Sequence, residues 1–167
     1  MQEDQAQHLA QLRAAFPETP IDAKRAFDDW GTTYLDAEPY MERLDGKTWQ
    51  ELDRAYLVTR SDALGFLGTQ FVVAVLPVYL SSLVEEGIWS PAVDTLLLLL
   101  TKPGPEKKVG LKLERFEALV AALTPMQRTV IAAVLSELAA TDPDGSPGRA
   151  ARDAVERHWK IYLSSRS

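Results

Sequence analysis

The apolar run FVVAVLPVYL, Phe71 to Leu80, constrains the fold of this chain more than any other segment. A helix that crosses a membrane needs about 20 apolar residues. This run is ten residues long, and two charged residues, Glu85 and Glu86, follow it closely. The shorter run LLLLL, Leu96 to Leu100, is also flanked by charge. Both runs therefore predict helices that are buried in a core rather than membrane spans.

The first of these helices should extend from Gln70 to about Glu85. Thr69 is a suitable N-terminal cap, and Gly87 can end the helix because glycine readily adopts the left-handed conformation found there. Pro77 lies inside this segment and lacks the amide that would bond to the carbonyl of Val73. We therefore expect Pro77 to bend or divide the helix.

Helical spacing continues along the chain, whereas strand patterns are poor. Thr48 lies three residues before Glu51, the spacing of a capping box, and Thr124 with Pro125 can start a late helix. Apolar residues three and four apart, together with caps and breakers, predict helices over 5–16, 23–30, 40–44, 49–58, 90–100, 116–123, 124–138 and 147–163. The expected fold class is all-α, a single-domain irregular helical bundle of about six to eight helices with a loop-rich acidic N-terminal third.

A chain of 167 residues is long enough for one domain with one hydrophobic core. We divide this single domain, 1–167, into an acidic, loop-rich N-terminal part (1–47), a helical core (48–141), a linker (142–148) and a C-terminal docking helix (149–167). The linker is assigned from its turn-rich sequence DPDGSPG. Val155, Trp159 and Tyr162 would form the docking face of the last helix.

The composition excludes several chemistries. The chain has no cysteine, so thiol catalysis, disulfides and thiolate metal sites are ruled out. Its two histidines, His8 and His158, are far apart in the sequence, and no GxSxG, P-loop or GxGxxG motif is present. We therefore predict no catalytic residue, no cofactor and no metal site. The acidic start of the chain does not resemble an export signal, which favours the cytoplasm.

The negative charge is concentrated in the first third of the chain. Residues 1–62 hold 13 Asp plus Glu against 7 Lys plus Arg, whereas residues 63–167 hold 11 of each. A basic patch of Lys107, Lys108, Lys112 and Arg115 is too small for a nucleic-acid binder in a chain of net charge -6. We predict no nucleic-acid partner and no membrane partner.

Several spaced motifs occur in a fixed order: a helix that ends in Ala-Phe-Pro, a Gly-x-x-Trp element, a central Leu-Pro-x-aromatic helix, and a Thr-Pro start to a late helix. The positions are Phe16, Gly46, Trp49, Leu76, Pro77, Tyr79 and Pro125. With these motifs the chain resembles, over residues 9–140, a family of small bacterial proteins known only as a domain of unknown function. The resemblance implies a stand-alone helical accessory protein and supplies no activity.

The acidic N-terminal part also contains aromatic residues set among its acids. Acids can steer a basic partner and aromatic rings can anchor it. The residues expected at such an interface are Asp28, Asp29, Trp30, Tyr34, Asp36, Glu38, Tyr40 and Glu42. This pattern predicts a non-enzymatic intracellular interaction protein, most concretely an inhibitor or immunity protein that binds a basic partner such as a toxin.

Three other interpretations stay open. The rings could cap the core while the acids confer solubility. Two of these carboxylates, held close together, could serve a hydrolase or lyase, with or without a divalent cation. The chain could also be a subunit of a larger assembly that docks through its last helix.

Overall fold

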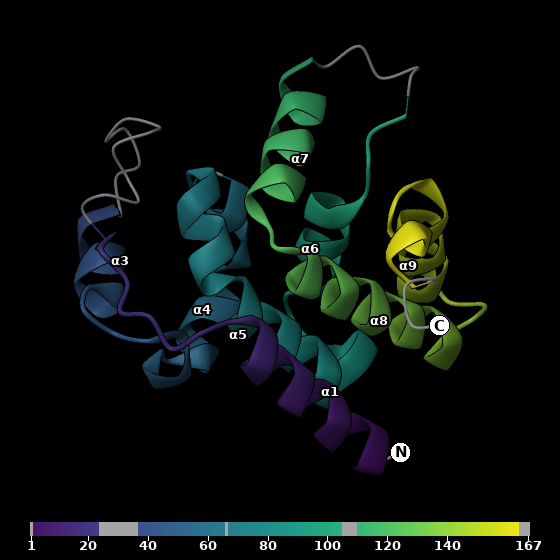
Figure 1. Ribbon diagram of the computed structural model, residues 1–167, viewed down its shortest axis with the longest axis horizontal. Coiled ribbons are helices and arrows are strands. Elements are labelled where there is room, and N and C mark those ends of the chain that lie inside the picture. Colours follow the sequence, from purple (N-terminus) through teal and green to yellow (C-terminus); the bar gives the residue numbers. More distant parts are fainter. Residues whose placement is uncertain (1, 24–36, 66, 105–109, 164–167) are drawn as a thin grey trace.

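The computed structural model describes residues 2–23, 37–65, 67–104 and 110–163 of the chain. Within these ranges the chain forms α-helices and short 3-10 helices and contains no strand (Figure 1), so the prediction of an all-α bundle is confirmed. The α-helices are α1 (Gln2–Ala15), α3 (Ala37–Leu44), α4 (Arg54–Thr59), α5 (Thr69–Glu86), α6 (Val93–Leu100), α7 (Gly110–Ala122), α8 (Pro125–Thr141) and α9 (Ser146–Arg157). The 3-10 helices are η1 (Trp49–Glu51), η2 (Ser61–Gly65), η3 (Gly87–Trp89) and η4 (Trp159–Tyr162).

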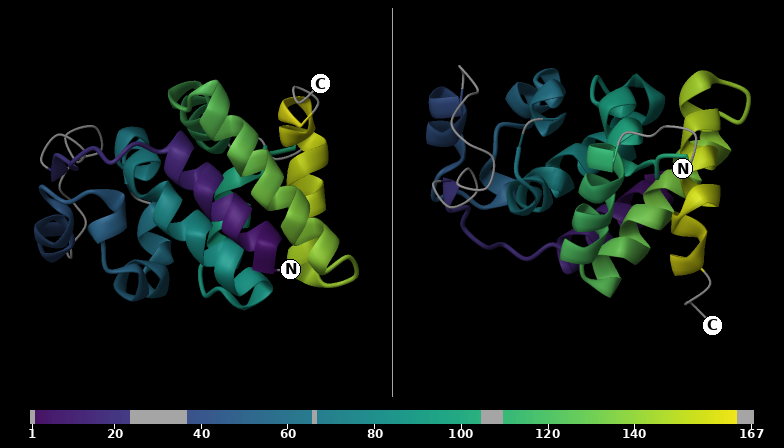
Figure 2. Two further views of the ribbon diagram at one scale, coloured as in Figure 1. Left: turned by 60° about the horizontal axis from the view of Figure 1, so that its bottom comes forward. Right: turned by 90° about the horizontal axis from the view of Figure 1, so that it is seen from above.

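Helix α5 lies at the centre of the bundle. Helix α1 contacts both α5 and α8, and α4 and α7 contact α5 from other sides (Figure 2). One continuous cluster of buried apolar side chains extends from Leu12 on α1 through α5 to Trp159 on η4. A single cluster that includes residues from both ends of the chain is what one domain requires.

The ends of α5 follow from local backbone preferences. Gly87 follows the helix with a φ of 58°, and its amide bonds to the carbonyl of Leu83, so the expected end at this glycine is confirmed. At the other end Gly68 occupies the N-cap position, and Thr69, which we expected there, is the first helical residue. Pro77 lies inside the helix without dividing it. Pro77 and most of the surrounding residues of α5 are buried, and this packing outweighs the one hydrogen bond that proline removes.

By length and composition alone, Thr69–Trp89 is apolar enough to cross a membrane. In this fold, however, 67% of its most apolar window is buried by other parts of the same chain. A buried core helix passes the same test of length and composition, and α5 packs against α1, α4, α7 and α8. The cytoplasmic location stays a prediction.

The segment from Trp49 to Val58 is not one helix, contrary to our expectation. Leu52, with a ψ of 144°, is extended and separates η1 from α4. The carboxylate of Asp53 then accepts a hydrogen bond from the backbone amide of Tyr56 at 3.1 Å and caps α4. A second N-cap therefore interrupts the helix that the first capping sequence starts, because aspartate favours the extended conformation at this position.

The C-terminal part of the chain is fastened to α6 and α8. Helix α9 begins at Ser146, so the expected linker 142–148 already includes its first residues. Trp159, which follows α9 in the chain, is 0% exposed. Its indole Nε1 donates a hydrogen bond of 2.6 Å to the carbonyl of Leu100 on α6. Val155 is also buried. These contacts tie the last helices to the common core.

Candidate functional site

The structure describes only part of the predicted acidic interface. Five of its eight residues, Asp28, Asp29, Trp30, Tyr34 and Asp36, lie outside the described residues. The other three belong to α3, which lies at the edge of the molecule (Figure 1). Of these, Glu42 is exposed, and the side chain of Glu38 is outside the description.

Tyr40, the remaining predicted residue, lies in the core rather than on the surface. It is 2% exposed, and its hydroxyl lies 3.1 Å from the hydroxyl of Tyr79, which in turn donates to the carbonyl of Leu57 at 3.1 Å. Its ring also lies 6.0 Å from the ring of Phe71. Tyr40 therefore cannot anchor a partner in this structure, and the alternative in which the ring packs in the core holds for this residue.

Several carboxylates of the acidic third have local structural roles. The carboxylate of Asp45 accepts a hydrogen bond from the amide of Ala23 at 3.1 Å, and that of Glu51 accepts from the amide of Thr48 at 2.8 Å. The hydrogen bond from the Thr48 backbone is the main cause of a lowered pKa of Glu51. Such bonds favour the ionised form, so Glu51 stays negative at neutral pH while it holds a turn.

A groove with a volume of about 580 Å³ lies between the end of α1, the following segment 17–22, η1 and α5. We name it the Trp49 groove. The indole Nε1 of Trp49 donates a hydrogen bond of 2.9 Å to the carbonyl of Phe16. This bond holds the ring across the end of α1. The groove is lined by Phe16, Pro17, Thr19, Pro20, Ile21, Asp22, Trp49, Gln70, Val73, Ala74, Pro77 and Gln127.

The charge around the Trp49 groove is mainly negative. Asp22 is part of its lining, and Glu18, which is exposed, lies between two lining residues in the chain. Glu51 is exposed on η1, two residues after Trp49. Among the described residues, Lys47 is a base near this groove, because its carbonyl accepts a hydrogen bond from the amide of Ile21. Among the described residues, the groove thus combines apolar side chains with the carboxylate of Asp22, and two exposed acids, Glu18 and Glu51, lie near its lining residues in the chain.

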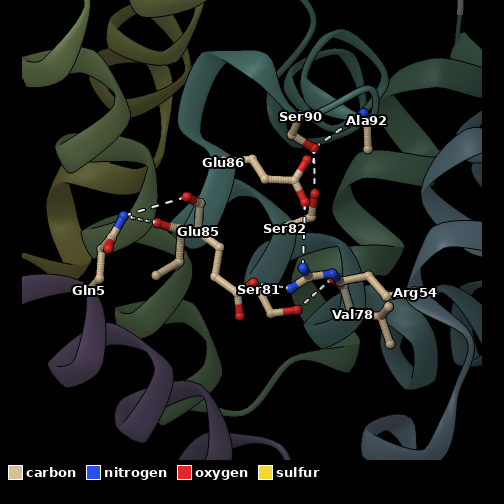
Figure 3. Close-up of polar contacts among 10 residues, drawn as sticks. Gln5, Arg54, Val78, Ser81, Ser82, Glu85, Glu86, Ser90 and Ala92 are labelled. Atoms are coloured by element: carbon tan, nitrogen blue, oxygen red, sulfur yellow. Dashed lines mark hydrogen bonds and ion pairs between the residues drawn. The ribbon is translucent and has the colours of Figure 1, made fainter. Parts of the chain in front are cut away.

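A second polar cluster lies at the C-terminal end of α5 (Figure 3). The guanidinium of Arg54 pairs with Glu85 and lies 3.6 Å from the carboxylate of Glu86. From α1, the side-chain amide of Gln5 donates to the carbonyl of Val84 at 3.2 Å. These groups join α1, α4 and α5, and cations near a helix C-terminus also stabilise its dipole. The cluster has a structural role.

The buried serines next to this cluster bond to each other and to the backbone. The hydroxyls of Ser82 and Ser90 are 2.7 Å apart, and the Ser90 oxygen also accepts from the amide of Ala92 at 3.3 Å (Figure 3). The Ser81 hydroxyl donates to the carbonyl of Val78 at 2.7 Å. A serine nucleophile needs a general base beside its hydroxyl, and these hydroxyls meet only other hydroxyls and backbone groups in these bonds.

Within the described residues, no group of three or more His, Cys, Asp or Glu side chains could hold a metal ion. Among the same residues, no buried side-chain nitrogen or oxygen lacks a hydrogen-bond partner. The absence of a metal site stays a prediction.

A protein-family model described as a family of unknown function, DUF6714, matches residues 4–163. The chain belongs to this family. The match confirms the resemblance to a domain of unknown function. No curated protein and no solved structure matches the chain.

Five of the seven motif residues of this DUF6714 chain line the Trp49 groove or are fully buried. Phe16, Trp49 and Pro77 line the Trp49 groove, whereas Leu76 and Tyr79 are 0% exposed. Our interface prediction placed the aromatic anchors between Trp30 and Tyr40 and omitted Trp49. The sequence contains a signal for Trp49, because this residue of the Gly-x-x-Trp motif is aromatic and Glu51 follows it two positions later.

Proposed function

We propose that this chain is a non-enzymatic interaction protein, an inhibitor or immunity protein that binds a basic partner such as a toxin through its acidic N-terminal third. The observation that carries the proposal is the Trp49 groove, whose lining combines apolar residues with Asp22, while the exposed Glu18 and Glu51 lie close to lining residues in the chain. Aromatic and apolar pockets supply most of the affinity of an interface, and surrounding charges speed association and select the partner.

The distribution of charge along the whole chain also favours a basic partner. All of its excess negative charge is in residues 1–62, where 13 acids face 7 bases. An uneven distribution of this kind creates a field that attracts a basic partner to one part of the surface. A lysine or arginine of the partner could place its aliphatic part over Trp49 and its charge near the carboxylates.

The structural roles of the acids favour binding over carboxylate chemistry. Asp45, Glu51 and Asp53 accept hydrogen bonds from backbone amides at 3.1, 2.8 and 3.1 Å, respectively. Backbone amides thus hold these three carboxylates in place. The hydrogen bonds from Thr48 lower the pKa of Glu51, so Glu51 is suited to present a fixed negative charge, whereas a general acid must keep its proton near neutral pH.

The test begins with the purified chain immobilised as bait in a lysate of its own source, at low and at physiological salt, with mass spectrometry of what binds. Association kinetics with any stoichiometric basic partner are then measured for the double charge reversal Glu18→Lys with Asp22→Lys. We expect association to slow by roughly tenfold or more at low salt, with a weaker salt dependence, because steering is removed.

The matched control reverses two exposed carboxylates on α7, Glu114→Lys with Glu117→Lys, which change the net charge equally. Equal slowing in both double variants would show that only the net charge matters and would exclude the Trp49 groove as the interface. Unchanged kinetics in the groove variant would reject this site for the partner that was captured.

A further inference from the structure

The wall of the Trp49 groove that comes from α5 contains a helix carbonyl whose usual donor is missing. Val73, Ala74 and Pro77 all line the groove. The carbonyl of an α-helical residue points along the axis to the amide four residues later, on the same face. For Val73 this position is Pro77, which has no amide hydrogen. Val73 is only half-buried, so its carbonyl is an acceptor at this wall that the helix does not satisfy in the usual way.

The wall that comes from α8 contains a buried side-chain amide. Gln127 is 6% exposed and lines the same groove. Its Oε1 accepts a hydrogen bond from the backbone amide of Thr124 at 2.9 Å. A backbone amide can only donate, so this bond identifies the other end of the side chain as the amino group, which carries two donors. Among the hydrogen bonds of the described residues, none uses this nitrogen.

The side-chain nitrogen of Gln127 is not enclosed in the core. Within the part of the chain that the structure describes, no fully buried side-chain nitrogen or oxygen lacks a hydrogen-bond partner. The Nε2 of Gln127 therefore belongs to the small exposed part of this side chain. Because Gln127 lines the Trp49 groove, that exposed part faces the groove. The groove thus has a donor on α8 and an acceptor on α5.

The rest of the groove offers apolar surface that is already in place. The ring of Trp49 is fixed by its bond of 2.9 Å to the carbonyl of Phe16, which also uses the only donor of the indole. Pro17 and Pro20 line the groove beside it. Helix α1, which leads into this segment, contacts both α5 and α8 (Figure 2). A few polar groups in an otherwise apolar groove fix the orientation of a ligand.

The two polar groups distinguish between classes of ligand. A carboxylate only accepts hydrogen bonds and would leave the Val73 carbonyl without a donor, whereas an ammonium or guanidinium group only donates and would leave Gln127 without an acceptor. A peptide group carries a donor and an acceptor at its two ends. A hydroxyl carries both on one oxygen, but Val73 and Gln127 belong to different helices. The peptide group is therefore the better match.

We propose that the Trp49 groove binds an extended peptide segment of the partner. One peptide group of this segment donates its N–H to the carbonyl of Val73 and accepts a hydrogen bond from the side-chain amide of Gln127. In peptide recognition, main-chain hydrogen bonds of this kind give affinity, and neighbouring pockets select the side chains. The inference rests on the function proposed above, because it names the part of the partner that enters the groove.

The probe is a dodecapeptide that is selected from a random phage-displayed library on the native chain. Clones that also bind Ala74→Trp are discarded, because a bulky side chain at this half-buried lining position fills the groove. The tightest remaining peptide is synthesised and titrated by calorimetry at pH 8 in about 1 M salt. The Debye length there is about 3 Å, so exposed charges contribute little to the affinity.

The acceptor on α5 is tested with ester analogues of this peptide, each of which has one backbone N–H replaced by oxygen. With the native chain, one position should lose affinity by roughly fivefold, the effect of one neutral hydrogen bond. In Pro77→Ala the carbonyl of Val73 regains a helical donor, so the ester at that position should cost nothing further. Alanine also favours the helix, so this variant keeps α5.

The donor on α8 is tested with Gln127→Glu. Glutamate is a usual residue at this position of a capping box, so it can still accept from the amide of Thr124 while the amino group is lost. We expect the native peptide to bind roughly fivefold more weakly. The matched control is Gln50→Glu, the same charge change at an exposed residue of η1 outside the groove lining, which should bind as the native chain does.

Three results would overturn the inference. These are a selection in which no peptide distinguishes the native chain from Ala74→Trp, an ester scan that gives the same losses in the native chain and Pro77→Ala, and native affinity in Gln127→Glu. Circular dichroism and thermal unfolding of each variant separate loss of the groove from loss of the fold.

Failure of this inference can be told apart from failure of the proposed function. A captured basic partner that is slowed by the reversal of Glu18 and Asp22, but binds Gln127→Glu and Pro77→Ala as tightly as the native chain, would keep the function and remove the peptide contacts. Selected peptides that pass the three tests, without a basic partner that responds to the charge reversal, would keep the contacts and remove the function.

Discussion

The indole Nε1 of Trp49 donates a hydrogen bond to the backbone carbonyl of Phe16, 2.9 Å away, although the two residues are 33 positions apart in the sequence. Phe16 follows the last residue of α1, where helix carbonyls have no intrahelical partner. The bond therefore satisfies the end of one helix and fixes the start of η1 beside it. Both residues line the Trp49 groove, so the groove depends on this contact.

Replacing Trp49 by phenylalanine should destabilise the fold by about 1–2 kcal/mol, because the ring is largely kept while the Phe16 carbonyl loses its donor. Urea unfolding followed by circular dichroism measures the change. Trp89→Phe is the matched control, because Trp89 is 83% exposed and should tolerate the same replacement with little loss. Equal losses in the two variants would show that the indole hydrogen bond contributes nothing specific.

The buried hydroxyl of Tyr79 should make stability depend on alkaline pH. Burial raises the pKa of Tyr79 to about 12, whereas a tyrosine in the unfolded chain has a pKa near 10. Above pH 10 the unfolded chain releases this proton before the folded chain does, so the free energy of unfolding falls as the pH rises from about 10 towards 12. Below pH 10 the protonated Tyr79 hydroxyl makes its full contribution to the free energy of unfolding.

The measurement compares urea unfolding at pH 9 and pH 11 for the native chain and for Tyr79→Phe. The variant should be less stable at pH 9, since it loses bonds to Tyr40 and to the Leu57 carbonyl, yet lose less stability on going to pH 11. An identical loss in both proteins would mean that Tyr79 does not contribute to the alkaline response.

Gly148 should tolerate no side chain. A Cβ atom at this position would lie 1.6 Å from the carbonyl oxygen of Asp142, and because that atom belongs to the backbone the chain must move. We expect Gly148→Ala to cost roughly 2 kcal/mol or more, despite the better helix propensity of alanine in α9. At Gly65 a Cβ atom would meet nothing within 4 Å, so Gly65→Ala is the control. Thermal unfolding of the two variants measures the loss of stability. A native melting temperature for Gly148→Ala would contradict the close contact between position 148 and the Asp142 carbonyl.

The helices that were easiest to predict are those whose signals are local. The cap of α8 is an example, because the Thr124 hydroxyl accepts from the amide of Gln127 at 3.2 Å and Gln127 accepts from the amide of Thr124 at 2.9 Å. These residues are only three apart, and Pro125 follows the cap. The signal for the break before α4 is also local, because Asp53 is a second N-cap directly before that helix.

The candidate site was harder to predict because it combines distant segments. For Tyr40 the sequence does contain a signal, the spacing of four residues to Leu44. Leu44 is 1% exposed, so both residues lie on the inward face of α3. That spacing could have identified Tyr40 as a core residue. The Trp49 groove, in contrast, joins residues near 16, 49, 73 and 127, and no spacing in the sequence shows that these segments meet.

Lys102→Met should raise the pKa of His158, because it removes one of the two positive charges that oppose protonation of the ring. Burial is the larger cause and remains, so the pKa should stay below the ordinary value of about 6.5. A lowered pKa also means that the unfolded chain binds the proton more readily, so His158 reduces stability as the pH falls below about 6.5. The variant should reduce this acid sensitivity.

Proton NMR of the His158 ring gives the pKa directly, and Lys160→Met, a charge change elsewhere in the same part of the chain, should leave it unchanged. If both lysine variants shifted the pKa equally, the effect would be one of net charge, and Lys102 would not act on His158 specifically.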